Sequence, residues 1–171
     1  MIPRISNILY ATDLSKNSAY AFRYAVNSAE KHDARIHILH VLEKMPLAAY
    51  VRLRESIPPE KFEAIFKESK EKSLSQIKNR LLKFCERELI DKPACLSKVA
   101  SILVVEGDPA GEILQKADEL EADVVIMGTH GKGLLAHAFL GSVAEKVLHR
   151  IKIPVFIIPI PKETDISFWD V

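Results

Sequence analysis

Cysteine and long charged or apolar runs are scarce in this chain. The two cysteines, Cys85 and Cys95, match neither a CxxC pair nor a metal-binding set. A disulfide between them is one alternative, but two buried or free thiols in a reducing cytoplasm are the favoured interpretation. No long basic run occurs, and 24 basic against 23 acidic residues leave a net charge of +1, which offers no electrostatic argument for nucleic-acid binding.

Membrane and secretion signals are also missing. No apolar run approaches the length of a membrane span. The N-terminal residues lack the basic head, long apolar stretch and small-residue cleavage site of a signal peptide. We therefore expect a soluble, cytoplasmic protein that binds neither nucleic acid nor membrane.

Hydrophobic residues make up 48% of the 171 residues, which excludes a disordered or collagen-like chain and suffices for one domain with a core. Short apolar runs alternate with longer amphipathic segments. Strands are expected at Ile5–Ala11, Ile36–Leu42, Lys98–Val105, Val124–Met127 and Ile153–Ile158. Helices are expected after Ser15, from Glu60, from Pro109 behind the N-cap residue Asp108, and over Ser142–Arg150.

Two further features concern the middle of the chain. Residues 44–59 are expected to be irregular, because Pro46, Pro58 and Pro59 mark the limits of a loop or short insertion. The long helix after them carries one apolar stripe, and its Lys- and Glu-rich opposite face is interpreted as solvated surface. The stripe consists of Phe62, Ile65, Phe66, Leu74, Ile77, Leu81 and Cys85.

Strands that alternate with helices predict a doubly wound parallel sheet with helices on both faces. In such a sheet, ligands bind beyond the carboxyl ends of the strands, at the point where the strand order reverses. Three segments with ligand-like chemistry lie at the carboxyl ends of predicted strands: Thr12–Asp13, His40–Glu43 and Gly128–Gly131. Their coincidence is the strongest argument for a binding site that the residues provide by themselves.

Four of the six glycines lie between residues 128 and 141. A strand, a glycine-bearing loop and a helix N-terminus together hold phosphate well, because backbone N–H groups approach the anion closely. Two alternatives stay open: the glycines serve only the turn, or Ser142, which has capping-box spacing with Glu145, serves only to cap the helix. The clustering of the glycines favours phosphate binding.

Better-known phosphate motifs fit poorly. The P-loop pattern GxxxxGK[ST] is absent. Residues 131–136 formally satisfy the dinucleotide pattern GxGxxG/A, but they follow the fourth strand, and no acidic residue ends the next strand to bind a ribose. A nicotinamide or flavin dinucleotide is therefore disfavoured.

The spacing Gly128-x2-Gly131-x9-Gly141-Ser142 resembles the nucleotide-binding signature of the universal stress protein family, in its ATP-binding branch. The segment Ile8–Ser15 looks like that family's opening strand and acidic turn, and His40–Leu42 and Gly107–Pro109 look like the ends of its second and third strands. The resemblance implies a universal stress protein domain over residues 1–159, a C-terminal tail over 160–171, and a Rossmann-like sheet of the adenine nucleotide alpha hydrolase type with five strands in the order 3-2-1-4-5.

The same resemblance implies a role for individual residues in ATP binding. Asp13 would lie near the ribose and phosphates, Val41 would meet the adenine through its backbone, and Gly107 is a weaker candidate near the base. The implied binding residues are Ala11, Thr12, Asp13, Val41, Met127, Gly128, Gly131, Gly141 and Ser142. A carboxylate repels a triphosphate, so Mg²⁺ is the expected mediator at Asp13; the alternative is that Asp13 only caps the following helix.

The family also implies a homodimer in which the last strand, Pro154–Ile158, pairs across the two-fold axis. No nucleophile elbow, general base with an oriented partner, or multi-carboxylate metal centre is evident. The sequence therefore favours an ATP-binding switch or sensor in stress response. The alternatives are a slow Mg²⁺-dependent ATPase using Asp13, or a nucleotide-free stress protein that binds a protein partner.

Overall fold

The computed structural model describes residues 2–90, 93–129 and 140–159, and the predicted tail and Gly131 lie outside them. Five strands, five α-helices and one 3-10 helix form in these ranges. In chain order they are β1 (Asn7–Ala11), α1 (Lys16–His32), β2 (Arg35–Leu42), α2 (Leu47–Ser56), α3 (Pro59–Glu88), the 3-10 helix η1 (Pro93–Lys98), β3 (Val99–Glu106), α4 (Pro109–Glu119), β4 (Val124–Gly128), α5 (Ser142–Leu148) and β5 (Val155–Ile158).

The strands form one parallel sheet in the order β3-β2-β1-β4-β5, which confirms the predicted fold class and strand order. The order reverses at β1, whose Ile8 pairs with Ile36 of β2 on one side and Val124 of β4 on the other. This reversal point is where a doubly wound sheet binds ligands.

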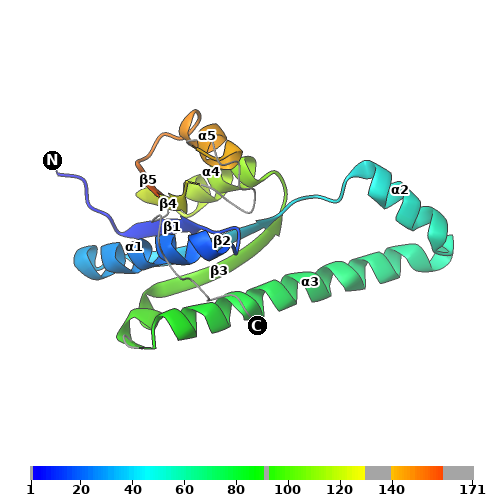
Figure 1. Cartoon of the computed structure of the whole chain (residues 1–171), viewed down its shortest axis with the longest axis horizontal. Coiled ribbons are helices and arrows are strands. Elements are labelled where there is room, and N and C mark those ends of the chain that lie inside the picture. Colours follow the sequence, from blue (N-terminus) through cyan, green and yellow to red (C-terminus); the bar gives the residue numbers. More distant parts are fainter. Residues whose placement is uncertain (1, 91–92, 130–139, 160–171) are drawn as a thin grey trace.

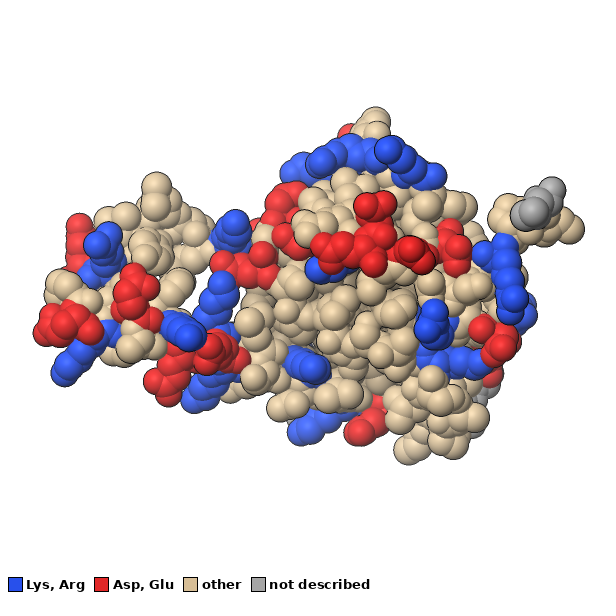
Figure 2. All heavy atoms as spheres, turned by 180° about the vertical axis from the view of Figure 1, so that it is seen from behind, with Lys and Arg blue, Asp and Glu red and all other residues tan. Residues whose placement is uncertain are grey.

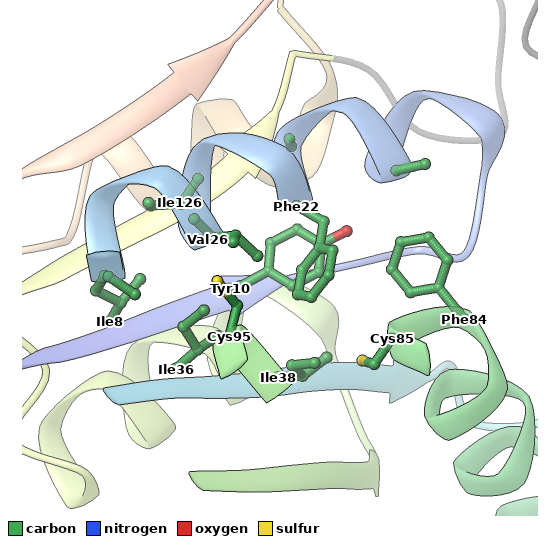
Figure 3. Packing of buried hydrophobic residues seen from close by; sticks show 14 of the residues in the cluster. Ile8, Tyr10, Phe22, Val26, Ile36, Ile38, Phe84, Cys85, Cys95 and Ile126 are labelled. Carbon is green, nitrogen blue, oxygen red and sulfur yellow. The ribbon is translucent and has the colours of Figure 1, made fainter. Parts of the chain in front are cut away.

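Helices cover both faces of the sheet (Figure 1). Side chains alternate between the faces, so Ile8 and Tyr10 of β1 pack with α1 and α3, whereas Leu9 and Ala11 pack with α4 and α5. In Figure 3, the rings of Tyr10, Phe22 and Phe84 meet between α1, the sheet and α3. The ring centroids are 5.3 Å apart for Tyr10 and Phe22 and 5.1 Å apart for Phe22 and Phe84.

Both cysteines are buried in this core as thiols, as the sequence predicts, and neither forms a disulfide. Burial raises the pKa of Cys85 to about 12, so the thiol stays protonated at neutral pH and Cys85 serves packing rather than reaction. The Cys95 thiol donates a hydrogen bond to Glu30 Oε1 at 3.1 Å.

The prediction that residues 44–59 are irregular is wrong. Helix α2 occupies most of this segment, because Pro46 and Pro58 lie at its two boundaries rather than inside it. α2 packs on the start of α3 through Tyr50, whose ring contacts Phe62 and Phe66 edge-to-face, each at a centroid distance of 5.4 Å. These two helical segments project from the sheet (Figure 1).

Because the start of α3 projects from the sheet (Figure 1), only part of its predicted apolar stripe is buried. Leu81 and Cys85, near the C-terminal end of the helix, are buried against the sheet, but Ile65 is 45% exposed because no strand lies beneath that turn. Acidic and basic side chains are intermixed on the projecting part in Figure 2, in agreement with a solvated surface.

Candidate functional site

A cavity of about 540 Å³ lies at the carboxyl ends of β1, β2 and β4, where the strand order reverses. It is lined by the segment after β1, the end of β2, the start of α4, the end of β4 and the start of α5. The lining residues are Ala11, Thr12, Asp13, Ser18, Leu39, His40, Val41, Leu42, Glu43, Pro109, Ile113, Met127, Gly128, Thr129, Leu140, Gly141, Ser142, Val143 and Ala144.

All the expected binding residues except Gly131 lie in this lining, and Gly131 is outside the described residues. The weaker candidate Gly107 is not in the lining. It is buried, and its N–H donates to the Leu42 carbonyl at 2.9 Å. A Cβ on Gly107 would lie 2.4 Å from Glu112 Oε1, so a larger residue here would require the Glu112 side chain to move.

The turn after β1 is tied closely to β2. The Thr12 N–H donates to the Leu39 carbonyl at 2.9 Å, and the Thr12 carbonyl lies 2.8 Å from His40 Nδ1. Tyr10 supports the next turn, because its hydroxyl donates to the Ser18 carbonyl at 2.5 Å. Burial raises the pKa of Tyr10 above its usual value, so this hydroxyl remains a donor.

Asp13 combines a local structural role with an oxygen that is available to a ligand in the cavity. Its Oδ1 accepts hydrogen bonds from Ser15 N at 3.1 Å and from Ser15 Oγ at 2.6 Å. Its Oδ2 is buried and has no hydrogen-bond partner among the described residues. A buried carboxylate oxygen without a partner is costly, which favours a ligand donor or a cation at this atom.

Gly141 and Ser142 lie where the chain enters α5. Gly141 N donates to the Thr129 carbonyl at 2.7 Å, and Thr129 N donates to the Ile158 carbonyl at 3.1 Å. These bonds hold the entry to α5 beside the ends of β4 and β5. Gly141 occupies the N-cap position, and Ser142 is the first helical residue rather than the cap.

Several lining residues escaped the sequence reasoning. Leu39 lies on β2, two positions before Val41, and Ser18 lies in the first turn of α1. Pro109 and Ile113 enter from α4, whose start is fixed as predicted by Asp108, which accepts a hydrogen bond from Gly111 N at 2.9 Å. Topology could have indicated Pro109 and Ile113, because a helix that follows a parallel strand begins near the carboxyl ends of the strands, where the cavity opens.

No cluster of three or more His, Cys, Asp or Glu side chains suited to a metal ion lies within the described ranges. None of the helices in the described part of the chain is long and apolar enough to cross a membrane.

Comparison with known proteins identifies the family. Residues 4–159 match the model of the universal stress protein family. The chain belongs to this family. It is 31% identical over 156 residues to universal stress protein MJ0531 of Methanocaldococcus jannaschii, an alignment that covers 91% of this chain and 83% of the relative.

Solved structures agree with the fold. The structure of MJ0577, also from Methanocaldococcus jannaschii, has a TM-score of 0.71 and 26% identity, and the match covers 94% of this chain and 100% of that one. A universal stress protein solved in complex with cAMP has a TM-score of 0.51 and 21% identity, over 92% of this chain and 98% of that one. The second likeness concerns the fold alone.

Proposed function

We propose that this universal stress protein binds ATP in the cavity at the carboxyl ends of β1, β2 and β4, and that it acts in the cytoplasm as a nucleotide-dependent switch. One observation carries the proposal: Asp13, Val41 and Gly141, which lie far apart in the chain, line the same cavity.

The chemistry of the lining supports a nucleotide. Leu39, Val41 and Ile113 offer an apolar surface to a flat base. Thr12, Gly128 and Ser142 belong to the segments that offer backbone and hydroxyl groups to ribose and phosphate. A ligand with one apolar end and one anionic end suits this combination.

Asp13 fits a divalent cation that accompanies the nucleotide. Its buried, unpartnered Oδ2 is the kind of hard oxygen ligand that Mg²⁺ prefers. Mg²⁺ would neutralise phosphate charge beside this carboxylate, and Asp13 would hold the ion while Thr12 and His40 keep the turn in place.

Switching follows from differential binding. A nucleotide shifts the conformational population only if it binds one conformation more tightly than another. The His40–Glu43 segment that lines the cavity continues directly into α2 and the projecting part of α3. A ligand-dependent change at the end of β2 can therefore pass along the chain to α2 and so alter the surface that α2 and the start of α3 form.

Calorimetric titration of ATP, with and without Mg²⁺, into nucleotide-stripped protein tests the proposal. We expect micromolar binding that a Gly141→Val variant loses, because a branched side chain there occupies the space of the phosphates. The melting curve of the variant checks that it remains folded. GTP and cAMP titrations show whether another nucleotide occupies the cavity instead.

The metal role has a matched pair of variants. Asp13→Asn should weaken Mg²⁺-dependent ATP binding by about ten-fold, whereas Asp118→Asn, on the exposed side of α4, should leave it unchanged. Absence of ATP binding to folded wild-type protein would refute the proposed function. Mg²⁺-dependent phosphate release that Asp13→Asn abolishes would favour the ATPase alternative over a pure switch.

A further inference from the structure

Leu14, directly after Asp13, has a backbone conformation that a leucine rarely adopts. Its φ angle is 62°, in the left-handed region. A Cβ atom crowds the backbone in this region, so bulky residues avoid it and glycine accepts it readily. The conformation therefore requires an explanation from the surrounding structure.

Capping of a helix end does not explain it. The other non-glycine residues with positive φ in the described part of the chain are Asp33 and Glu121. Asp33 is the left-handed C-cap of α1, and Glu121 follows the end of α4, where a left-handed residue is ordinary. Leu14 precedes a helix, so its left-handed backbone serves a different purpose.

The contacts of the turn show what the conformation achieves. The Leu14 side chain is buried in the core that α1 and α3 share, and Leu14 N donates to Thr12 Oγ1 at 3.1 Å. Leu14 is not part of the cavity lining, whereas its neighbour Asp13 is. The turn thus sends two adjacent side chains in different directions, Leu14 into the core and Asp13 to the cavity.

The carboxylate of Asp13 is the second feature of this turn. Oδ1 is held by Ser15 N and Ser15 Oγ, so the carboxylate cannot rotate freely, and Oδ2 stays buried without a partner among the described residues. A strained residue and an unpaired oxygen side by side are the mark of a group held ready for a ligand.

We propose that Leu14 is a positioning residue: its left-handed backbone and buried side chain hold Asp13 so that Oδ2 faces the bound ligand. The ligand group at this oxygen is a hydrogen-bond donor or a cation, and the inference rests on the proposed binding of ATP with Mg²⁺. Leu14 itself contacts neither ATP nor Mg²⁺, because it lies outside the cavity lining.

Two substitutions separate backbone conformation from packing. Leu14→Ala and Leu14→Gly both remove the buried side chain, but only glycine keeps the left-handed conformation accessible without strain. In the alanine variant the turn relaxes, the fraction of molecules competent to bind falls, and the apparent affinity falls with it. We expect Leu14→Gly to bind ATP with Mg²⁺ about five-fold more tightly than Leu14→Ala.

The control pair is Glu121→Ala and Glu121→Gly, at a left-handed position outside the cavity lining. There, glycine should raise the melting temperature relative to alanine without changing ATP affinity. In an Asp13→Asn background, the difference in affinity between the two Leu14 variants should disappear, since no ionised carboxylate is left to position.

The outcomes distinguish the two proposals. If wild-type protein binds ATP with Mg²⁺ but the two Leu14 variants bind equally, or the alanine variant binds more tightly, the positioning role is overturned and the proposed function stands. If the difference persists in the Asp13→Asn background, Leu14 acts through something other than Asp13 and the inference is overturned. If folded wild-type protein binds no ATP, the proposed function and this inference fail together.

Discussion

The Asp123 side chain links the starts of β1 and β4, at the end of the strands opposite the cavity. Its Oδ2 accepts hydrogen bonds from Ser6 N at 2.7 Å and Asn7 N at 2.9 Å, more than a hundred positions away in the chain. Asn7 Nδ2 in turn donates to the Glu121 carbonyl at 3.3 Å. One carboxylate thus satisfies two backbone donors at the point where the central strand begins.

An Asp123→Ala substitution should destabilise the protein by about 2 kcal/mol, because both part-buried N–H groups lose a charged acceptor. Urea unfolding followed by circular dichroism measures the change. Asp118→Ala, which removes an exposed carboxylate from α4, is the control and should change stability by less than about 0.5 kcal/mol. Equal stability of the two variants would show that water replaces the carboxylate without loss.

At the scale of elements, α2 lies outside the main core. It has no buried residue, and its attachment to α3 includes the edge-to-face contacts of Tyr50 with Phe62 and Phe66. A ten-residue helix is too short to be stable alone in water. The existence of α2 therefore depends on packing more than on helix propensity.

A Tyr50→Ala substitution should increase amide hydrogen exchange across residues 47–56 by about ten-fold, because two aromatic pairs are lost. Exchange in the strands of the sheet should stay as in the wild type. Val51→Ala, which changes a side chain that is 42% exposed, is the control. Unchanged exchange in α2 after Tyr50→Ala would mean that other contacts hold this helix.

At the scale of the whole molecule, the sheet has one edge at β3 and the other at β5. Helix α3 lies along β3 (Figure 1). Phe156 of β5 is 39% exposed. Because an apolar edge strand invites pairing with another chain, we propose that the protein is a homodimer that associates through β5.

Phe156→Lys should shift the protein from dimer to monomer in sedimentation-velocity experiments at micromolar concentration, since the lysine places like charges together at the two-fold axis. Tyr24→Lys, which replaces an aromatic residue of α1 that is 42% exposed, should remain dimeric. A wild-type protein that sediments as a monomer, or a Phe156→Lys variant that stays dimeric, would contradict assembly through β5.

The sequence by itself determined the five strands, all but one of the α-helices in the described ranges, the parallel sheet, and the segments after β1, β2 and β4 that line the cavity. Apolar runs such as Val124–Met127 mark buried strands by local chemistry, and Asp108 with Pro109 marks the start of α4. These features depend on residues close together in the chain, so pattern and propensity suffice to predict them.

Only the tertiary structure decided which residues meet across the chain. It placed α2 between two prolines that had indicated a loop, exposed Ile65 where α3 extends past the sheet, and brought Ile113 to the cavity. It also revealed the left-handed Leu14 and the Oδ2 of Asp13, which has no hydrogen-bond partner among the residues that the structure describes. The physical reason is that burial, strain and hydrogen-bond satisfaction depend on neighbours far away in sequence, which no local pattern contains.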